Sequence, residues 1–553
     1  MSVTRRKLLV AATLTALVAA VLAVGTYAHA AARATSHARA VRAVDSFLRA
    51  WSEGRWKDAR DLTAPAHDSA ALDAASYLSR TASGLHASSI SFERGAVAIR
   101  GGSASAAVTV HAAIRGLGRF AYDNSITLVK PKGLGWRVSF SERTVHPKLT
   151  AGTRLIRVRS MPQRGRVLSA DGQELAPLDA ELASNVVGSI GGLTGAQASA
   201  LGDRADVGDP VGESGLERAL GKTLAATAQG SVAIADARGL VLDTLQTYAG
   251  KPGSDVRTTF NLATQTAAER ALRGIEKPAA LVAIDTTTGA VTAIVDNPLG
   301  GFPRALVGPY APGSTFKIVT STAALLAGRT ASTQLQCPKS IKVGGRTFVN
   351  AEDEELGTIP LVDAFAQSCN TAYAQLVEGL PLSAVADASR MYGFTDSRDS
   401  PGPLTIPGVG GFFPVPDSYA RGIGQAIGQD QVVASPVQMA SVAAAVAAGE
   451  WRQPYLLDPA PANLAHHTIP VASILREFMA AVVSRGTAKH AGLPAGTFGK
   501  TGTAEFGPGP PYKTHAWFVG FRGRTAFALI IEGGGFGGKV AAPVAARFLN
   551  LLG

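Results

Sequence analysis

The chain has 553 residues, enough for several domains of about 100–200 residues each. Hydrophobic residues make up 46% and charged residues only 17%, which excludes a disordered chain and allows large buried cores. Two cysteines exclude a disulfide-rich framework and a cysteine-rich metal site, and the excess of 53 Lys and Arg over 41 Asp and Glu is spread too thinly to indicate a nucleic-acid-binding surface.

An apolar segment follows a basic cluster at the N-terminus. The cluster at residues 5–7 precedes an uncharged run, residues 8–24, that extends toward Ala32. The run is near the roughly 17–25 residues that a membrane-spanning helix needs, and the basic cluster is expected to stay in the cytoplasm. We therefore expect residues 1–32 to form a cytoplasmic tip and an uncleaved single-pass anchor, with the rest of the chain outside. The small residues around Ala30 also resemble a cleavage site, so a secreted form stays open.

A small α+β unit is expected at residues 35–143. Apolar side chains recur at three- and four-residue spacing from Val44 to Trp51, and Gly54 ends this helix. Alternating apolar residues then predict strands at residues 90–93, 108–114, 126–128 and 136–140. We assign this unit no chemistry and expect it to be a spacer.

A β-rich domain is expected at residues 145–252. Residues 164–168 and 171–176 predict two strands joined by an Asp-Gly turn, and residues 214–217 carry the sequence Ser-Gly-Leu-Glu. The C-terminal domain, residues 255–553, begins after it. Its first elements are a helix and two strand-like runs that form a hairpin, residues 280–285 and 290–295.

A serine stands at the start of a predicted helix, with a lysine one turn further on. The pattern becomes helical at Ser314 and ends at Gly328, so Ser314 and Lys317 share one helix face with their Cβ atoms about 5–6 Å apart. A serine hydroxyl needs a base, and a lysine whose pKa is lowered by burial and by the helix dipole can be that base. Alone, the spacing is weak evidence, and a helix N-cap serine with a solvated lysine would be the preferred interpretation.

Ser368, Cys369 and Asn370 follow a predicted helix, residues 361–367. A tight loop at this point would direct Ser368 and Asn370 to one side and Cys369 to the other. We interpret Cys369 as a small buried hydrophobic residue rather than a reactive thiol. We do not expect it to pair with Cys337, although an extracytoplasmic location would permit that disulfide.

Lys500, Thr501, Gly502 and Thr503 are expected on an edge strand. Glycine allows a ligand to approach the backbone closely, and the two threonines alternate onto one side of the strand. Two hydroxyls and an ammonium group can hold a carboxylate. The residues by themselves therefore predict serine acyl transfer with a carboxylate-ended substrate, and they call for no metal or cofactor.

The three motifs, S-x-x-K at Ser314, S-x-N at Ser368 and K-T-G-T at Lys500, resemble in this order those of the penicillin-recognising serine acylases. The motifs at 164–176 and 214–217 resemble the pedestal, or dimerisation, domain of class B penicillin-binding proteins, although Ser-Ala replaces the usual Asp-Arg at 169–170. Residues 428–440 resemble an element of the same enzymes, which we interpret as structural. The unit at 35–143 resembles the nuclear transport factor 2-like domain of the methicillin-resistance type.

This resemblance implies a multidomain α+β fold: a membrane anchor, a nuclear transport factor 2-like domain, a β-rich pedestal and a transpeptidase domain whose antiparallel sheet is flanked by helices. It implies that the chain is a D,D-transpeptidase that cross-links peptidoglycan stem peptides and is acylated by β-lactams. Other cell-wall synthesis proteins are further expected partners, and nucleic acid is not. The implied catalytic residues are Ser314, Lys317 and Ser368. The implied substrate-binding residues are Asn370, Lys500, Thr501, Gly502 and Thr503.

Two other functions stay open. A D,D-carboxypeptidase or β-lactamase-like hydrolase would use the same serine and let water resolve the acyl-enzyme; no hydrolytic carboxylate stands at a recognisable spacing, but the acidic residues 352–355 prevent its exclusion. A non-catalytic scaffold or β-lactam sensor is disfavoured by the intact Ser314, Lys317 and Lys500. A bifunctional class A enzyme is disfavoured because the unit before residue 145 is too small and β-rich for a glycosyltransferase.

Overall fold

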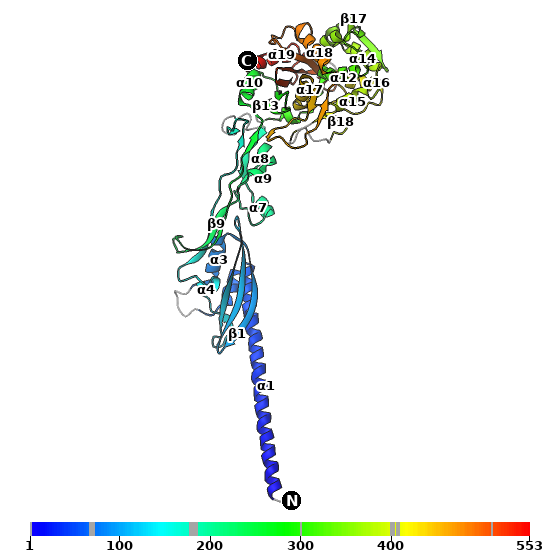
Figure 1. The fold of residues 1–553 in the computed structure, drawn as a ribbon. Coiled ribbons are helices and arrows are strands. Elements are labelled where there is room, and N and C mark those ends of the chain that lie inside the picture. Colours follow the sequence, from blue (N-terminus) through cyan, green and yellow to red (C-terminus); the bar gives the residue numbers. More distant parts are fainter. Residues whose placement is uncertain are drawn as a thin grey trace. The chain divides into compact units, whose positions relative to one another are not determined.

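The computed structural model describes residues 3–65, 72–175, 186–298, 301–398, 404, 410–509 and 512–553, with side chains from residue 13 onward. These residues form two compact units, whose elements are labelled in Figure 1. Unit 1 contains residues 1–164, 192–210 and 226–253, and unit 2 contains residues 165–191, 211–225 and 254–553. The chain therefore passes between the units several times.

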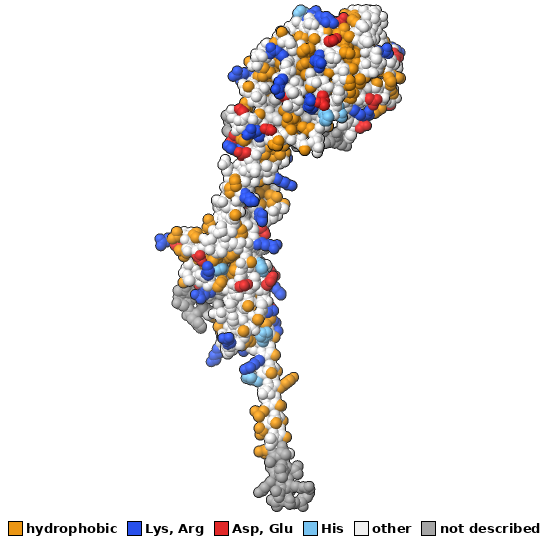
Figure 2. All heavy atoms as spheres, viewed as in Figure 1, with side chains coloured by type: hydrophobic (Ala, Val, Ile, Leu, Met, Phe, Trp, Pro, Cys, Tyr) orange, Lys and Arg blue, Asp and Glu red, His pale blue; other side chains and the backbone are white. Residues whose placement is uncertain are grey.

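Unit 1 begins with one long helix, α1 (Val3–Ser52). The apolar side chains between Leu14 and Tyr27 are exposed, and Figure 2 shows them along the surface of the helix. The helix is long and apolar enough to cross a membrane by its length and composition. The predicted apolar N-terminal helix is therefore confirmed, and it suits a membrane anchor.

From Ala40 onward α1 packs against an antiparallel sheet with the order β1-β2-β3-β4. Val44, Phe47, Leu48 and Trp51 are buried, which confirms the predicted helical spacing. The predicted strand regions coincide with these four strands, and the first three strands are longer than predicted. The elements are α2 (Trp56–Asp61), α3 (Ala74–Leu85), β1 (Ala87–Arg100), β2 (Ser103–Ile114), β3 (Gly118–Val129), β4 (Arg137–Val138) and α4 (Glu142–Val145).

A second antiparallel sheet of unit 1 has the order β10-β9-β5. Arg159 on β5 pairs with Asp209 at 2.7 Å, and both side chains are largely buried, so the segment around Asp209 is held to this sheet. The elements of this region are β5 (Arg154–Ser160), α7 (Gly195–Leu201), β9 (Gln229–Ala235) and β10 (Val241–Tyr248). The paired strands β7 (Ile190–Gly192) and β8 (Pro210–Gly212) each have residues in both units.

In unit 2 a small sheet joins β6 (Val167–Leu168), β11 (Val256–Thr258) and β21 (Leu457–Asp458). Gly172 has a φ of +85°, which fits the predicted Asp-Gly turn. The second predicted strand is reduced to a single bridge between Leu168 and Glu174, and residue 176 lies outside the described residues. The Ser-Gly-Leu-Glu motif leads into the short helices α8 (Gly215–Ala219) and α9 (Gly221–Leu224).

The core of unit 2 is an antiparallel five-stranded sheet with the order β13-β12-β25-β24-β23. The predicted hairpin is confirmed as β12 and β13, and Gly289 in its turn has a φ of +83°. Every residue from Ala279 to Ile284 is buried, so helices cover both faces of the sheet: α10 packs with α19, and α17 packs with α18 (Figure 1). The bounds are β12 (Ala279–Asp285), β13 (Val291–Asn297), β23 (Thr497–Phe506), β24 (Lys513–Arg522), β25 (Thr525–Ile531), α10 (Leu262–Leu272), α17 (Pro436–Ala448), α18 (Ala472–Ser484) and α19 (Ala541–Leu552).

The remaining elements of unit 2 lie between β13 and β23 in the sequence. They are α11 (Arg304–Val307), the 3₁₀ turn η2 (Gly313–Phe316), α12 (Lys317–Leu326), β14 (Gln334–Cys337), β15 (Ser340–Val343), β16 (Arg346–Val349), η3 (Ala351–Asp353), β17 (Gly357–Pro360), α13 (Leu361–Ala366), α14 (Asn370–Glu378), α15 (Ala384–Arg390), β18 (Phe394–Thr395), β19 (Gly411–Phe412), α16 (Tyr419–Ala426), β20 (Glu450–Arg452) and β22 (His466–Thr468).

Cys337 and Cys369 form a disulfide, so the expectation that they stay unpaired is wrong. Their Cα atoms lie 6.2 Å apart because β14 packs against α14, although 32 residues separate them along the chain. The expectation that Cys369 is buried is confirmed. The pairing depends on this tertiary contact, which the sequence does not display.

Candidate active site

The predicted nucleophile lies in a 3₁₀ turn that continues directly into a helix. Ser314 belongs to η2, and Lys317 is the first residue of α12. The Lys317 Nζ atom lies 3.1 Å from the Ser314 Oγ atom. The Thr315 hydroxyl donates to the Pro312 carbonyl at 2.7 Å and fixes the turn. The three-residue spacing therefore brings the hydroxyl and the amine into direct contact.

Backbone from two other segments encloses this turn. The Gly313 N–H donates to the Gly428 carbonyl at 2.9 Å. A Cβ atom on Gly428 would stand 2.1 Å from the Gly313 oxygen, and one on Gly313 would stand 2.7 Å from the Thr503 oxygen. Both glycines also have positive φ, +76° and +53°. Only glycine fits these contacts, which set the position of Ser314.

The S-x-N segment meets the same lysine from the loop between α13 and α14. Lys317 Nζ donates to the Ser368 carbonyl at 2.7 Å and contacts the Ser368 hydroxyl at 3.3 Å. It also donates to the Asn370 Oδ1 atom at 2.7 Å. Ser368 has a φ of +62°, which is unusual for a residue other than glycine, and it turns this loop toward Lys317.

The K-T-G-T segment lies on β23, the edge strand of the five-stranded sheet, as predicted. Lys500 Nζ donates to the Ser368 Oγ atom at 2.9 Å and to the Thr501 carbonyl at 2.9 Å. Ser368 therefore lies between the two lysines. The structure brings together Ser314, Lys317, Ser368, Asn370 and Lys500 from three segments that are far apart in the sequence.

Both lysines are completely buried. Burial lowers the pKa of Lys317 well below its usual value, and the positive charge of Lys500 lowers it further. Burial also lowers the pKa of Lys500, to about 7. The ring of Tyr373 lies 5.1 Å from Lys317 Nζ, and that of Phe365 lies 5.5 Å from Lys500 Nζ. The lowered pKa favours the neutral amine of Lys317, the form that can accept the proton of Ser314.

The two threonines of the motif are held by groups outside it. The Thr501 hydroxyl lies 2.6 Å from the Thr487 hydroxyl, and the Gly537 N–H donates to the Thr503 Oγ1 atom at 3.4 Å. A Cβ atom on Gly502 would stand 2.8 Å from the Thr315 side chain, so Gly502 lets β23 lie against the nucleophile turn. The hydroxyls are thus oriented beside the edge of the strand.

Sequence reasoning missed several residues that shape this site. Tyr373 lies three residues after Asn370, and Phe365 lies three residues before Ser368, so helical spacing could have indicated both. Gly428 was interpreted as structural without its contact to the nucleophile turn. The sequence offers no such signal for Thr487, whose place depends on the packing of the segment after α18 against β23.

Replacing Thr487 with valine is expected to slow acylation by a β-lactam about 3- to 10-fold, because the Thr501 hydroxyl loses the partner that orients it. The measurement is the second-order rate constant for labelling by fluorescent penicillin. Thr497→Val is the matched control. The Thr497 hydroxyl is on β23, as Thr501 is, but it donates to the Pro494 carbonyl at 2.6 Å. Equal acylation rates for the two variants would contradict the role given to Thr487.

Residues 279–550 match the family model described as the penicillin binding protein transpeptidase domain, and residues 177–258 match that of the penicillin-binding protein dimerisation domain. The chain is 33% identical over 353 residues to the peptidoglycan D,D-transpeptidase PbpA of Mycobacterium tuberculosis. This alignment covers 53% of the chain and 71% of the relative. The chain belongs to the penicillin-binding protein family.

Solved structures share the fold of this chain. The D,D-transpeptidase domain of a peptidoglycan glycosyltransferase from Eggerthella lenta is 25% identical to this penicillin-binding protein, with a TM-score of 0.56 over 71% of this chain and 98% of that one. The penicillin-binding protein PBP2 of Helicobacter pylori, solved in complex with MreC, shares the fold, with a TM-score of 0.61, 17% identity, and coverage of 72% and 98%. The predicted multidomain α+β fold and the predicted serine-type peptidoglycan D,D-transpeptidase activity are confirmed.

Proposed function

We propose that this penicillin-binding protein cross-links peptidoglycan through an acyl intermediate on Ser314. One observation carries the proposal: a fully buried lysine, Lys317, contacts Ser314, Ser368 and Asn370 at the same time. Because burial and Lys500 lower the pKa of Lys317, its amine is available as a base.

In the first half-reaction Ser314 Oγ attacks the carbonyl carbon between the last two D-alanines of a stem peptide, and its proton passes to Lys317 Nζ. The tetrahedral oxyanion is stabilised by the N–H groups of Ser314 and Thr503. Collapse of this intermediate breaks the peptide bond. The leaving D-alanine amine receives a proton through Ser368, which lies 3.3 Å from Lys317 Nζ and 2.9 Å from Lys500 Nζ.

In the second half-reaction an amine of a neighbouring stem peptide attacks the acyl-serine carbonyl. The new amide forms as the bond to Ser314 Oγ breaks, and the proton that the amine loses returns to Ser314 through Lys317. Asn370 hydrogen-bonds the substrate backbone, Lys500 supplies positive field, and Thr501, Gly502 and Thr503 accommodate the terminal carboxylate. β-Lactams enter the first half-reaction as mimics of the terminal dipeptide.

The same proposal covers the rest of the chain. Residues 1–32 form a cytoplasmic tip and a single-pass anchor, and the catalytic domain, residues 255–553, lies outside the cytoplasm. Residues 35–143 form a nuclear transport factor 2-like domain; helices packed on a four-stranded antiparallel sheet support this. Residues 145–252 form the pedestal, and other cell-wall synthesis proteins are expected partners of the chain.

The test is mass spectrometry of the full chain after incubation with benzylpenicillin. A single adduct of the intact drug is expected, and its peptide is expected to contain Ser314. A Ser314→Ala chain, with Lys317 intact, is the matched control and is expected to carry no adduct. An adduct on another residue, or one that survives the substitution, would refute the proposed nucleophile.

The lifetime of the adduct separates the transpeptidase from a hydrolase on the same fold. Of the acidic residues that left this alternative open, Glu352 pairs with Lys539 at 2.6 Å, and Asp353 pairs with Lys339 at 3.2 Å. A long-lived adduct is the result that the proposed transpeptidase requires. Rapid release of hydrolysed drug would favour the hydrolase.

A further inference from the structure

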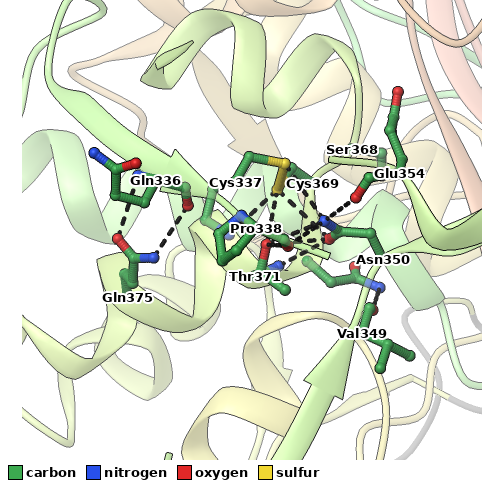
Figure 3. The surroundings of a disulfide bond; sticks show 12 residues. Gln336, Cys337, Pro338, Val349, Asn350, Glu354, Ser368, Cys369, Thr371 and Gln375 are labelled. Carbon is green, nitrogen blue, oxygen red and sulfur yellow. Dashed lines mark hydrogen bonds between the residues drawn. A yellow bond between two sulfur atoms is a disulfide. The ribbon is translucent and has the colours of Figure 1, made fainter. Parts of the chain in front are cut away.

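A buried disulfide ties the S-x-N segment, which carries Ser368 and Asn370, to the end of β14 (Figure 3). Cys369 stands between the two site residues and is bonded to Cys337 at the end of β14. The exposed fractions of the two cysteines are 1% and 0%. The β15–β16 hairpin begins three residues after Cys337, so the disulfide joins the strand that precedes this hairpin to the start of α14, against which the hairpin also packs.

Asn350, the residue directly after that hairpin, is hydrogen-bonded to residues beside both cysteines (Figure 3). Its Nδ2 group lies within donating distance of the Pro338 and Glu354 carbonyls, both at 2.9 Å, and of the Thr371 hydroxyl at 3.1 Å. Its Oδ1 atom accepts from the Thr371 N–H at 3.1 Å. The Thr371 hydroxyl donates to the Pro338 carbonyl at 2.8 Å. Asn350 and Thr371 are both buried, so breaking these bonds would leave polar atoms unpaired.

The residue before Asn350 connects this network to the active site. The Val349 carbonyl accepts from the Asn370 Nδ2 atom at 3.0 Å. The other end of that amide, Oδ1, accepts from Lys317 Nζ at 2.7 Å. A reversed amide would turn its NH₂ group toward the lysine amine and its oxygen toward the Val349 oxygen. The hairpin end therefore sets the orientation in which Asn370 meets Lys317.

Ser368 also needs support from its surroundings. Its left-handed backbone, with a φ of +62°, is costly for a residue with a side chain and persists only where neighbouring structure holds it. The adjacent residue, Cys369, is fixed by the disulfide, and its N–H donates to the Ala364 carbonyl at 2.9 Å. Both sides of the S-x-N loop are thus held by buried contacts that lie outside the reacting groups.

We propose that Cys337, Asn350, Cys369 and Thr371 form a positioning clamp for acylation. The clamp holds Ser368 and Asn370 against Lys317, and none of its four members takes part in the chemistry. This inference rests on the proposed roles of Ser314 and Lys317 and extends them to residues that act through others. Loss of the clamp lowers the rate of acylation by more than the loss of stability alone would.

The first test compares the full chain, solubilised in detergent, with Asn350→Ala and with the pair Cys337→Ala/Cys369→Ala. Acylation by fluorescent penicillin is expected to be at least about 10-fold slower in both variants, because small displacements of catalytic groups are costly. Gln438→Ala is the matched control: it removes another buried hydrogen bond, to the Tyr392 carbonyl at 2.6 Å. It is expected to lower the melting temperature and leave the acylation rate unchanged.

A double-mutant cycle separates positioning from general destabilisation. If the clamp acts through Asn370, then adding Asn350→Ala to Asn370→Ala is expected to slow acylation less than about 2-fold further. The inference would be overturned if the clamp variants acylated at rates within about 2-fold of the unmodified chain. It would also be overturned if Asn350→Ala slowed acylation by the same factor with and without Asn370→Ala. If Asn350→Ala does not fold, the acylation rate of Cys337→Ala/Cys369→Ala decides the test. Labelling that survives Ser314→Ala would instead refute the proposed function, so the two failures are distinguishable.

Discussion

Replacing Lys317 with methionine is expected to slow acylation of Ser314 about 10²- to 10⁴-fold, the typical contribution of a general base. Methionine has nearly the length of the lysine stem and no amine, so it fills the buried space and cannot take the serine proton. The contacts from Lys317 Nζ to Ser314 and Asn370, at 3.1 and 2.7 Å, are lost together. Stopped-flow labelling with fluorescent penicillin measures the effect.

The pH dependence of acylation is part of the same prediction. In the unmodified chain the rate is expected to rise with pH through the lowered pKa of Lys317, because only the neutral amine accepts a proton. The residual rate of Lys317→Met is expected to lack this rise. Lys339→Met is the control, since this exposed amine pairs with Asp353 at 3.2 Å and contacts none of the candidate site residues named above. If Lys317→Met kept the acylation rate and the pH dependence of the unmodified chain, the base would have to be another group.

Stability is expected to rise with pH because of Lys317 and Lys500. The pKa values of both lysines are lower in the folded chain than the ordinary lysine value of about 10.4. At pH values between the folded and the unfolded pKa, the unfolded chain therefore binds more protons than the folded one. The free energy of unfolding therefore rises with pH in that window, by up to about 1.4 kcal/mol per pH unit for each lysine. Lys317→Met is expected to lose its share of this slope in urea titrations at pH 7 to 10.

Local patterns were sufficient to predict the elements that carry the site. The apolar spacing after Ser314 predicts a helix, and α12 with its preceding 3₁₀ turn is that helix. The alternation around Lys500 predicts a strand, and β23 is at the sheet edge. Each of these depends on the periodicity of side chains within one segment, which sequence displays directly.

Contacts between segments were not predictable in the same way. The disulfide between Cys337 and Cys369 requires β14 to pack on α14, and no local pattern encodes that packing. Asn350 reads as an ordinary loop residue in the sequence, yet it is buried and bonded to Thr371. The three motifs could be grouped by resemblance, whereas the groups that hold them in place became visible only in the folded chain.

Replacing Gly428 with alanine is expected to be strongly damaging although it alters none of the reacting side chains. The new Cβ atom would stand 2.1 Å from the Gly313 oxygen, and alanine would be forced to a φ of +76°. We expect the free energy of unfolding to fall by about 2–4 kcal/mol and acylation to slow about 100-fold, because the turn carrying Ser314 must move.

The matched control for Gly428→Ala is Gly328→Ala. Gly428 contacts the turn that precedes α12, whereas Gly328 follows the C-terminal end of that helix. Gly328 also has a positive φ, +83°, but an added Cβ atom would meet nothing within 4 Å. This control carries the backbone cost without the collision, so it is expected to lose about 1–2 kcal/mol and keep its acylation rate. Urea unfolding and penicillin labelling of both variants make the comparison. If both slow acylation alike, backbone strain alone explains the effect, and contact between Gly428 and the nucleophile turn does not set the position of Ser314.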